Sequence, residues 1–197
     1  MKAILFALAI AAGGVLAGCQ PAPPEQKFLA TDITGAPFAR DFRLTDHNGR
    51  VRTLADFRGK AVAVFFGYTH CPDVCPTTLA DFAAALKLLG PKASRVQVIF
   101  VTVDPARDTP DLLRQFVPAF NPGFLGMYTD EASLKVLAKE YKVVYQKTAQ
   151  KGPDDYLIDH SAGTYVYDPE GRLRLLVPYG SPPDAIAQDL KKLLGAS

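Results

Sequence analysis

The chain has 197 residues, of which 48% are hydrophobic, and its formal net charge is +2. This length and composition suit one globular domain with a real core. The charge is too small and too dispersed to indicate a nucleic-acid-binding protein. The sequence has neither a P-loop pattern nor a glycine-rich dinucleotide fingerprint, so nothing in it indicates phosphate or dinucleotide binding.

The N-terminal stretch "MKAILFALAIAAGGVLAGC" has one basic residue, an apolar run and a small-residue ending. The apolar run is too short for a comfortable membrane span, and we interpret residues 1–18 as a secretory signal peptide. The ending "LAGC" resembles a bacterial lipobox, which would make Cys19 the lipidated first residue of the mature protein. A plain signal peptide or an uncleaved anchor, with Cys19 uninvolved, is the alternative.

The proline-rich stretch "QPAPPEQK" follows, and we interpret residues 19–34 as an extended membrane tether. Residues 35–197 are then expected to form one domain. We predict an exported lipoprotein whose domain lies in the periplasm or on the outer face of the cytoplasmic membrane. Lipid attachment at Cys19 would leave Cys71 and Cys75 as the remaining cysteines, in a compartment where thiol pairs tend to be oxidised.

The first half of the domain is predicted to contain a hairpin, two strands and a helix. Residues 41–59 alternate apolar and polar side chains around an Asn-Gly pair, which predicts a β-hairpin. The apolar runs "KAVAVFFGY" at 60–68 and "RVQVIFVTV" at 95–103 predict strands buried on both faces. Between them, apolar residues at helical spacing predict a helix over about 76–90.

The second half continues the alternation of helices and strands. In chain order we predict a helix over 108–120 with Thr109 as N-cap, a strand over 123–129, a helix over 130–142, a strand over 143–147, a polar loop over 148–159, a hairpin over 160–180 and a helix over 181–194. This order indicates an α/β or α+β sandwich. A cysteine pair between the first core strand and its following helix is the layout of a thioredoxin-like fold.

Cys71 and Cys75 lie four positions apart where a loop enters the predicted helix. That spacing can bring both sulfurs to one side, within disulfide range. A helix N-terminus also lowers the pKa of a thiol, which favours both thiol exchange and metal binding. The spacing therefore permits a disulfide and a metal site alike.

The ligand count narrows the metal alternatives. Two thiolates are an incomplete set for zinc but nearly enough for Cu(I), and an imidazole would complete a trigonal set. Of the three histidines, His47 is expected to be a solvated loop residue and His70 to point away from the sulfurs. His160 remains, after the polar loop, with the Asp159 carboxylate able to fix its tautomer. From position alone, a hydrogen-bonded structural histidine stays open.

Three segments carry a resemblance to a known family. "GYTHCPDVCPTTL", "VTVDPARDTP" and "DHSAGTYVYDPEGRL" closely resemble the Sco/SenC family of membrane-attached copper-binding proteins. They occur in the expected order across residues 35–195. The block with two cysteines and the later D-H-S block are the specific signals.

The resemblance implies a thioredoxin fold with an added N-terminal β-hairpin and an inserted segment before the C-terminal hairpin and helix. It implies one copper ion per chain, as Cu(I), Cu(II) or both, held by Cys71, Cys75 and His160, with Asp159 as a supporting residue. The implied function is copper delivery to the dinuclear copper centre of cytochrome c oxidase subunit II, or reduction of that centre's cysteines. Other periplasmic copper chaperones are expected as further partners, nucleic acid is not, and the protein is expected to be a monomer.

A thiol–disulfide oxidoreductase is the competing hypothesis. Cys71 would attack a partner disulfide and Cys75 would resolve the mixed disulfide, with no need for the histidine. The departure from C-x-x-C argues against a general oxidoreductase. A thiol peroxidase would rest on the fold alone.

Two further groups of residues lie close to the cysteines in the motifs. Asp104, Arg107 and Asp108 are expected to form a turn and a helix cap, with an ion pair possible. Tyr68 is expected to pack in the core, close enough to the site to cover it.

Overall fold

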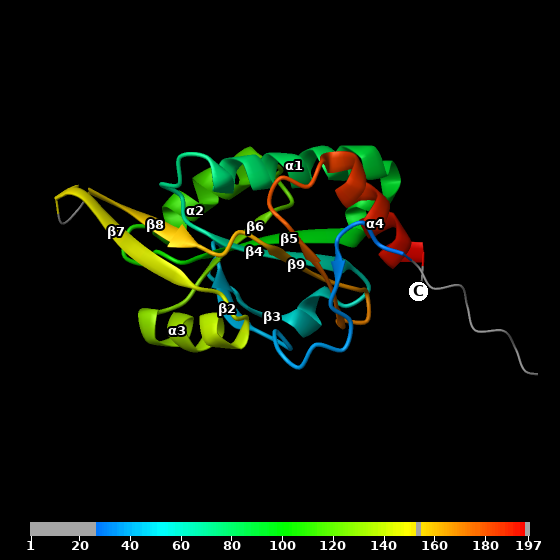
Figure 1. The fold of residues 1–197 in the computed structure, drawn as a ribbon, viewed down its shortest axis with the longest axis horizontal. Coiled ribbons are helices and arrows are strands. Elements are labelled where there is room, and N and C mark those ends of the chain that lie inside the picture. Colours follow the sequence, from blue (N-terminus) through cyan, green and yellow to red (C-terminus); the bar gives the residue numbers. More distant parts are fainter. Residues whose placement is uncertain (1–26, 153–154, 196–197) are drawn as a thin grey trace, which may run out of the picture.

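The computed structural model describes residues 27–152 and 155–195 (Figure 1). The predicted signal peptide and Cys19 lie outside these residues. Within the described part, no helix combines the length and the apolar character needed to cross a membrane.

An eight-stranded mixed sheet forms the centre of the domain, and a separate two-stranded sheet extends from one end (Figure 1). The strand order in the large sheet is β1 (Thr31–Asp32), β10 (Leu173–Val177), β9 (Thr164–Tyr167), β4 (Ala61–Gly67), β5 (Val96–Thr102), β6 (Leu125–Tyr128), β2 (Arg43–Asp46) and β3 (Val51–Thr53). The small sheet pairs β7 (Tyr145–Gly152) with β8 (Asp155–His160).

The helices cover both faces of the large sheet. Helices α1 (Val74–Leu89) and α4 (Pro183–Gly195) pack against each other on one face, and α3 (Glu131–Glu140) lies on the other (Figure 1). Helix α2 (Pro110–Phe116) contacts β6, and short 3₁₀ helices span Leu54–Phe57, Gly90–Arg95 and Val117–Ala119. The predicted α/β class is confirmed.

The centre of the core is formed by the two apolar runs that predict buried strands. All seven residues of β4 and all seven of β5 are buried, and the two strands pair in parallel. Strand β9 pairs with the other edge of β4 in the antiparallel direction. Because β4 is central, the segment that follows it is attached to the most buried part of the domain.

Helices α1 and α2 begin within two residues of their predicted starts. Helix α1 begins at Val74, two residues before the predicted start, so that Cys75 lies in its first turn. Helix α2 begins at Pro110, and the Thr109 hydroxyl oxygen accepts a hydrogen bond from the Leu112 N–H at 3.2 Å, as an N-cap does.

The folded domain begins earlier than the predicted boundary at residue 34. Strand β1 pairs with β10, and the N–H groups of Leu29 and Ala30 donate to the buried Asp189 carboxylate in α4. The tether prediction for residues 19–34 is therefore wrong at its C-terminal end. Strand β1 has only two residues, which is too short to give a detectable periodicity in the sequence.

The polar loop predicted over 148–159 is also wrong. Residues 148–152 belong to β7 and residues 155–159 to β8, and in this hairpin Tyr145 pairs with His160 and Lys147 with Ile158. Each strand pairs with the other through its inward-facing backbone groups, so the hairpin forms without a regular apolar pattern along its strands. Its polar side chains hide the period-two pattern on which a strand prediction depends.

The predicted first hairpin forms as β2 and β3, but His47 beside its turn is buried rather than solvated. The Gly126 N–H donates to His47 Nδ1 at 3.1 Å, and Arg114 donates to the His47 carbonyl oxygen at 2.6 Å. Burial lowers the pKa of His47. His47 is buried because β2 pairs with β6, which places the residue after β2 against the sheet.

Candidate metal centre

The two cysteines lie where the chain leaves β4 and enters α1. Cys75 is fully buried and Cys71 is partly exposed, and both carry free thiols. The Cys75 N–H points at Cys71 Sγ across 3.4 Å, and the Cys71 N–H donates to the Tyr68 carbonyl oxygen at 3.3 Å. The backbone therefore directs one N–H donor, that of Cys75, at the outer sulfur.

Gly67, the last residue of β4, makes the burial of Cys75 possible. A Cβ at this position would lie 2.7 Å from Cys75 Sγ and 2.8 Å from a ring carbon of Phe100. Both distances are shorter than van der Waals contact allows. The sulfur thus occupies the space that a side chain on Gly67 would fill.

The β7–β8 hairpin brings His160 to the cysteines from 85 residues downstream. His160 is the last residue of β8, and its Nε2 lies 3.5 Å from Cys75 Sγ. The ligand atoms of Cys71, Cys75 and His160 all lie within 4.8 Å of one another. This three-residue cluster, here called the Cys-Cys-His cluster, brings together the site residues singled out in the sequence.

The orientation of the His160 ring is set by a backbone carbonyl rather than by Asp159. His160 Nδ1 lies 3.0 Å from the Ser161 carbonyl oxygen, so Nδ1 carries the proton and the Nε2 lone pair faces the sulfurs. Asp159 is exposed, because adjacent strand residues point to opposite faces. The prediction that Asp159 fixes the tautomer is wrong, and sequence could not identify a backbone acceptor.

Aromatic rings enclose the imidazole. The rings of Phe65 and Tyr68 each lie with their centroid 6.0 Å from that of His160, in edge-to-face geometry. Tyr68 is buried, as predicted. These rings limit the motion of the imidazole and keep water from its buried side.

The two thiols differ in their protonation. The hydrogen bond from Cys75 is the main cause that lowers the pKa of Cys71 to about 3, with backbone N–H groups adding to the effect. The same bond, together with burial, raises the pKa of Cys75. At neutral pH, Cys71 is therefore a thiolate and Cys75 a thiol.

His70 does not join the cluster, as predicted. Its side chain is half exposed, and its Nδ1 lies 3.1 Å from the Thr69 hydroxyl and 3.8 Å from an Asp108 oxygen. Asp108 is buried and accepts hydrogen bonds from the Thr69 N–H at 3.0 Å and from the hydroxyls of Thr69 and Thr102 at 2.6 Å each. Asp108 thus fixes the start of the cysteine loop, a role beyond the predicted turn.

The cluster opens onto a groove between the cysteine loop and β8. The groove has a volume of about 280 Å³ and is lined by Tyr68, Cys71, Pro72, Asp73, Val74, Leu157, Ile158, Asp159, His160 and Ala162. Two sulfurs and one imidazole nitrogen are soft or borderline donors, a set that suits Cu(I) at low coordination number. The groove leaves one side of the cluster accessible to another molecule.

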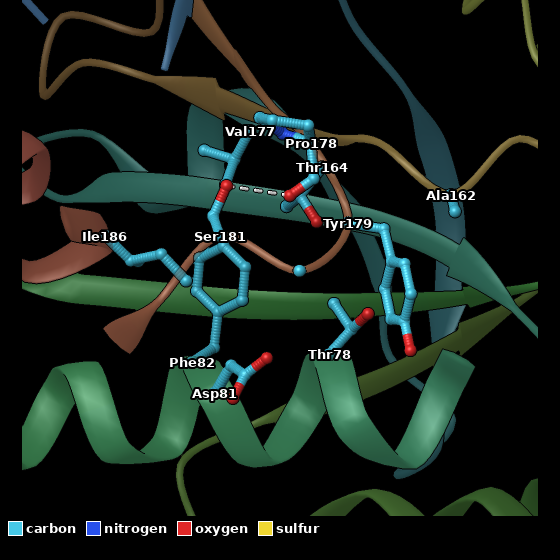
Figure 2. Close-up of a pocket in the computed structure, with 11 residues that line it drawn as sticks. Thr78, Asp81, Phe82, Ala162, Thr164, Val177, Pro178, Tyr179, Ser181 and Ile186 are labelled. Atoms are coloured by element: carbon cyan, nitrogen blue, oxygen red, sulfur yellow. Dashed lines mark hydrogen bonds between the residues drawn. The ribbon is translucent and has the colours of Figure 1, made fainter. Parts of the chain in front are cut away.

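A second pocket shares Ala162 with this groove but has different chemistry. It lies between α1 and the chain after β10, with Thr78 and Asp81 on one side and Tyr179 and Ser181 on the other (Figure 2). The Ser181 hydroxyl donates to the Pro178 carbonyl oxygen at 2.8 Å. The residues that line this pocket supply hydroxyl, carboxylate and apolar groups, none of which is a soft metal donor.

The fold and the cluster together define a thioredoxin-like protein with a Cys-Cys-His cluster at the end of its central strand. The family model for SCO1/SenC matches residues 30–195, and the chain belongs to this family. The match covers both cysteines, His160 and strand β1.

Curated relatives and solved structures agree with this assignment. The chain is 40% identical to "Protein SCO2 homolog, mitochondrial" of Bos taurus over 133 residues, which are 66% of this chain and 50% of that protein. It is 34% identical to the SCO2-like protein of Rickettsia felis, over 77% of this chain and 74% of the relative. The chain thus spans about half the length of some curated relatives it matches.

This chain covers nearly the whole length of two solved structures. Apo Sco1 of Thermus thermophilus superposes with a TM-score of 0.75 at 41% identity, over 87% of this chain and 99% of that one. Bradyrhizobium japonicum ScoI with copper bound superposes with a TM-score of 0.71 at 38% identity, over 78% and 97%. The described domain therefore has the architecture of solved Sco proteins.

Proposed function

We propose that this protein binds one copper ion through Cys71, Cys75 and His160 and delivers it to the dinuclear copper centre of cytochrome c oxidase subunit II. The observation that carries the proposal is the Cys-Cys-His cluster, whose ligand atoms lie within 4.8 Å of one another. Membership of the SCO1/SenC family and the likeness to ScoI with copper bound support it.

The protonation states of the cluster residues favour the binding of Cu(I), the ion that the protein would deliver. Cys71 is already a thiolate, and the Nδ1–H bond to Ser161 leaves Nε2 free to act as a ligand. Cys75 must lose its proton on binding, so copper affinity falls as the pH falls. The open groove lets a thiolate of the acceptor approach the ion while the cluster still holds it.

The setting of this activity is part of the proposal. Lipid attachment at Cys19 would hold the domain in the periplasm or on the outer face of the cytoplasmic membrane. Other copper chaperones there would load it, and a monomer would present the groove to one acceptor at a time.

The second candidate is a thiol–disulfide oxidoreductase, favoured by the thiolate character and exposure of Cys71. The Cys71 thiolate would attack a partner disulfide and release one partner thiolate. Cys75 would then lose its proton and attack Cys71 Sγ, releasing the second. The partner gains two electrons, and the Cys71–Cys75 disulfide holds the oxidised product.

Anaerobic titration of the reduced full chain with Cu(I) tests the first candidate. We expect one copper per chain in the native protein and a loss of affinity of at least tenfold in Cys71→Ser, Cys75→Ser and His160→Ala. Undiminished affinity in His160→Ala would remove the histidine from the site. An insulin reduction assay separates the candidates, since His160→Ala retains reductase activity if only the thiols act.

A further inference from the structure

The β7–β8 hairpin must be held against the domain for His160 to reach the cysteines. It forms its own two-stranded sheet, in which the ladder hydrogen bonds join β7 to β8 and not to the eight-stranded sheet. Tyr156, Ile158 and His160 alternate along β8 and so share one face. Contacts made by Tyr156 therefore bear on the position of His160, two pleats further along the strand.

Tyr156 is held by two side chains from the segment after β5. Arg107 Nη1 donates to the Tyr156 carbonyl oxygen at 3.0 Å, and the guanidinium carbon lies 3.5 Å from the centroid of the Tyr156 ring. The Tyr156 hydroxyl donates to Asp104 Oδ1 at 2.8 Å, and Arg107 Nε donates to Asp104 Oδ2 at 2.5 Å. These three residues form a closed set of contacts, here called the clasp.

The clasp is built on a buried anchor. Asp104 is fully buried, and its N–H donates to the Thr102 hydroxyl at 2.9 Å. Burial, with the bond to Asp104, raises the pKa of Tyr156 to about 12, which keeps its hydroxyl protonated as a donor. Arg107 Nη2 is buried without a hydrogen-bond partner among the described residues. The guanidinium thus gives up one hydrogen bond while it contacts both Asp104 and the hairpin.

The same turn also holds the cysteine side of the cluster. Asp108, one residue after Arg107, accepts two hydrogen bonds from Thr69 in the loop that leads to Cys71. The centroid of the Tyr68 ring lies near both Arg107 and His160, 5.9 Å from the guanidinium carbon and 6.0 Å from the imidazole centroid. One five-residue turn thus contacts both chain segments that supply ligands.

We propose that the turn from Asp104 to Asp108 sets the separation between His160 and the cysteines, with Arg107 as its positioning residue. Asp108 fixes the cysteine loop, while Arg107 and Asp104 fix Tyr156 and hence the end of β8. The proposal rests on the proposed function for its effect on copper. The position of the hairpin is a property of the metal-free protein.

Two mild substitutions in the clasp have matched controls. Arg107→Lys keeps the positive charge but cannot reach both Asp104 and the Tyr156 carbonyl. Tyr156→Phe keeps the ring and removes only the bond to Asp104. One control is Arg52→Lys, which alters another arginine paired with a buried aspartate, Asp46, at 2.9 Å. The other is Tyr145→Phe at the residue that pairs with His160, which removes a buried hydroxyl without a hydrogen-bond partner in the described part of the chain.

Cu(I) competition titrations measure the consequence for the ligands. We expect Arg107→Lys and Tyr156→Phe to weaken binding by about tenfold, with both controls within about twofold of the native protein. In a His160→Ala background, Arg107→Lys should cause no further loss, because the clasp acts through the histidine. An equal loss in both backgrounds would overturn the proposal.

A metal-free measurement keeps this test separate from the proposed function. The rings of Phe65 and Tyr68 shift the NMR signals of the His160 ring protons, so these signals report the position of the imidazole. We expect the signals to move toward exposed-histidine values in Arg107→Lys, and the amides of β8 to exchange faster, but not in Tyr145→Phe. Unchanged signals and exchange in both clasp variants would overturn the proposal, whether or not the native protein binds copper.

Discussion

Cys75 packs into the core directly against the last residue of β4, whereas His160 ends a polar hairpin outside the eight-stranded sheet. The first position is fixed by close packing of apolar strands. The second depends on a few buried polar contacts and on the packing of Ile158 and Tyr156 against the core. The proposed copper site therefore joins a rigid half, the cysteine loop, to a half carried on a separate two-stranded sheet. Such a division would suit the proposed delivery of copper.

The largest expected effect is the difference in reactivity between the two thiols of the rigid half. Since the pKa of Cys71 is about 3, its alkylation by iodoacetamide should change by less than about twofold between pH 5 and 8. An unperturbed thiol gains roughly tenfold per pH unit over the same range. Cys75, protonated and buried, should react at least about a hundredfold more slowly at pH 6.

Mass spectrometry of the metal-free, reduced protein after timed alkylation measures both rates. His160→Ala should leave the pKa of Cys71 low, because the bond from Cys75 is the main cause of its low value. A Cys71 rate that climbs tenfold per pH unit in the native protein would contradict the assignment of the thiolate.

Substitution of Gly67 is expected to break the rigid half. The methyl group of Gly67→Ala would meet Cys75 Sγ and Phe100 at less than 3 Å, so the free energy of unfolding should fall by about 1–3 kcal/mol. Displacement of Cys75 should also weaken copper binding. Urea unfolding and Cu(I) titration measure the two effects. Gly195→Ala is the control, because a Cβ there meets no described atom within 4 Å apart from its chain neighbours and its own helix backbone. Equal stability of the two variants would contradict the packing argument.

His47 provides a smaller and pH-dependent effect, remote from both halves. Its pKa is lowered by burial, so below about pH 6.5 the unfolded chain binds a proton that the folded protein does not. Stability should therefore fall as the pH drops through 6.5, by at most about 1.4 kcal/mol per pH unit for this one proton. Thermal unfolding of His47→Asn, whose amide oxygen can still accept from Gly126, should lose this part of the pH dependence. A slope identical to that of the native protein would show that His47 does not cause it.

The rigid half was largely predictable from sequence, and the physical reason is its apolar pattern. The continuous runs of β4 and β5, and the helical spacing in α1, are strong signals of burial. They place Cys71 and Cys75 at the end of the central strand. The Asn-Gly turn likewise predicts the β2–β3 hairpin.

The other half was not predictable in the same way. The β7–β8 hairpin has no apolar period, so position along the chain left His160 only as a candidate ligand, and the family resemblance was needed to assign it. The burial of His47, the Ser161 carbonyl at Nδ1 and the clasp at Tyr156 depend on contacts between segments far apart in the chain. Local propensity carries no information on such contacts.

The smallest expected effect distinguishes the observed support of His160 from the predicted one. Asp159 is exposed, and the Nδ1 proton of His160 goes to the Ser161 carbonyl, so Asp159→Asn should leave the Cu(I) affinity within about twofold of the native value. Ser161→Ala keeps the carbonyl and should behave alike. If Asp159 instead orients the imidazole once copper is bound, its loss should cost about tenfold or more in affinity, as for other residues that support metal ligands. Cu(I) competition titrations of the two variants beside Arg107→Lys would then show which polar contacts of the hairpin the histidine needs.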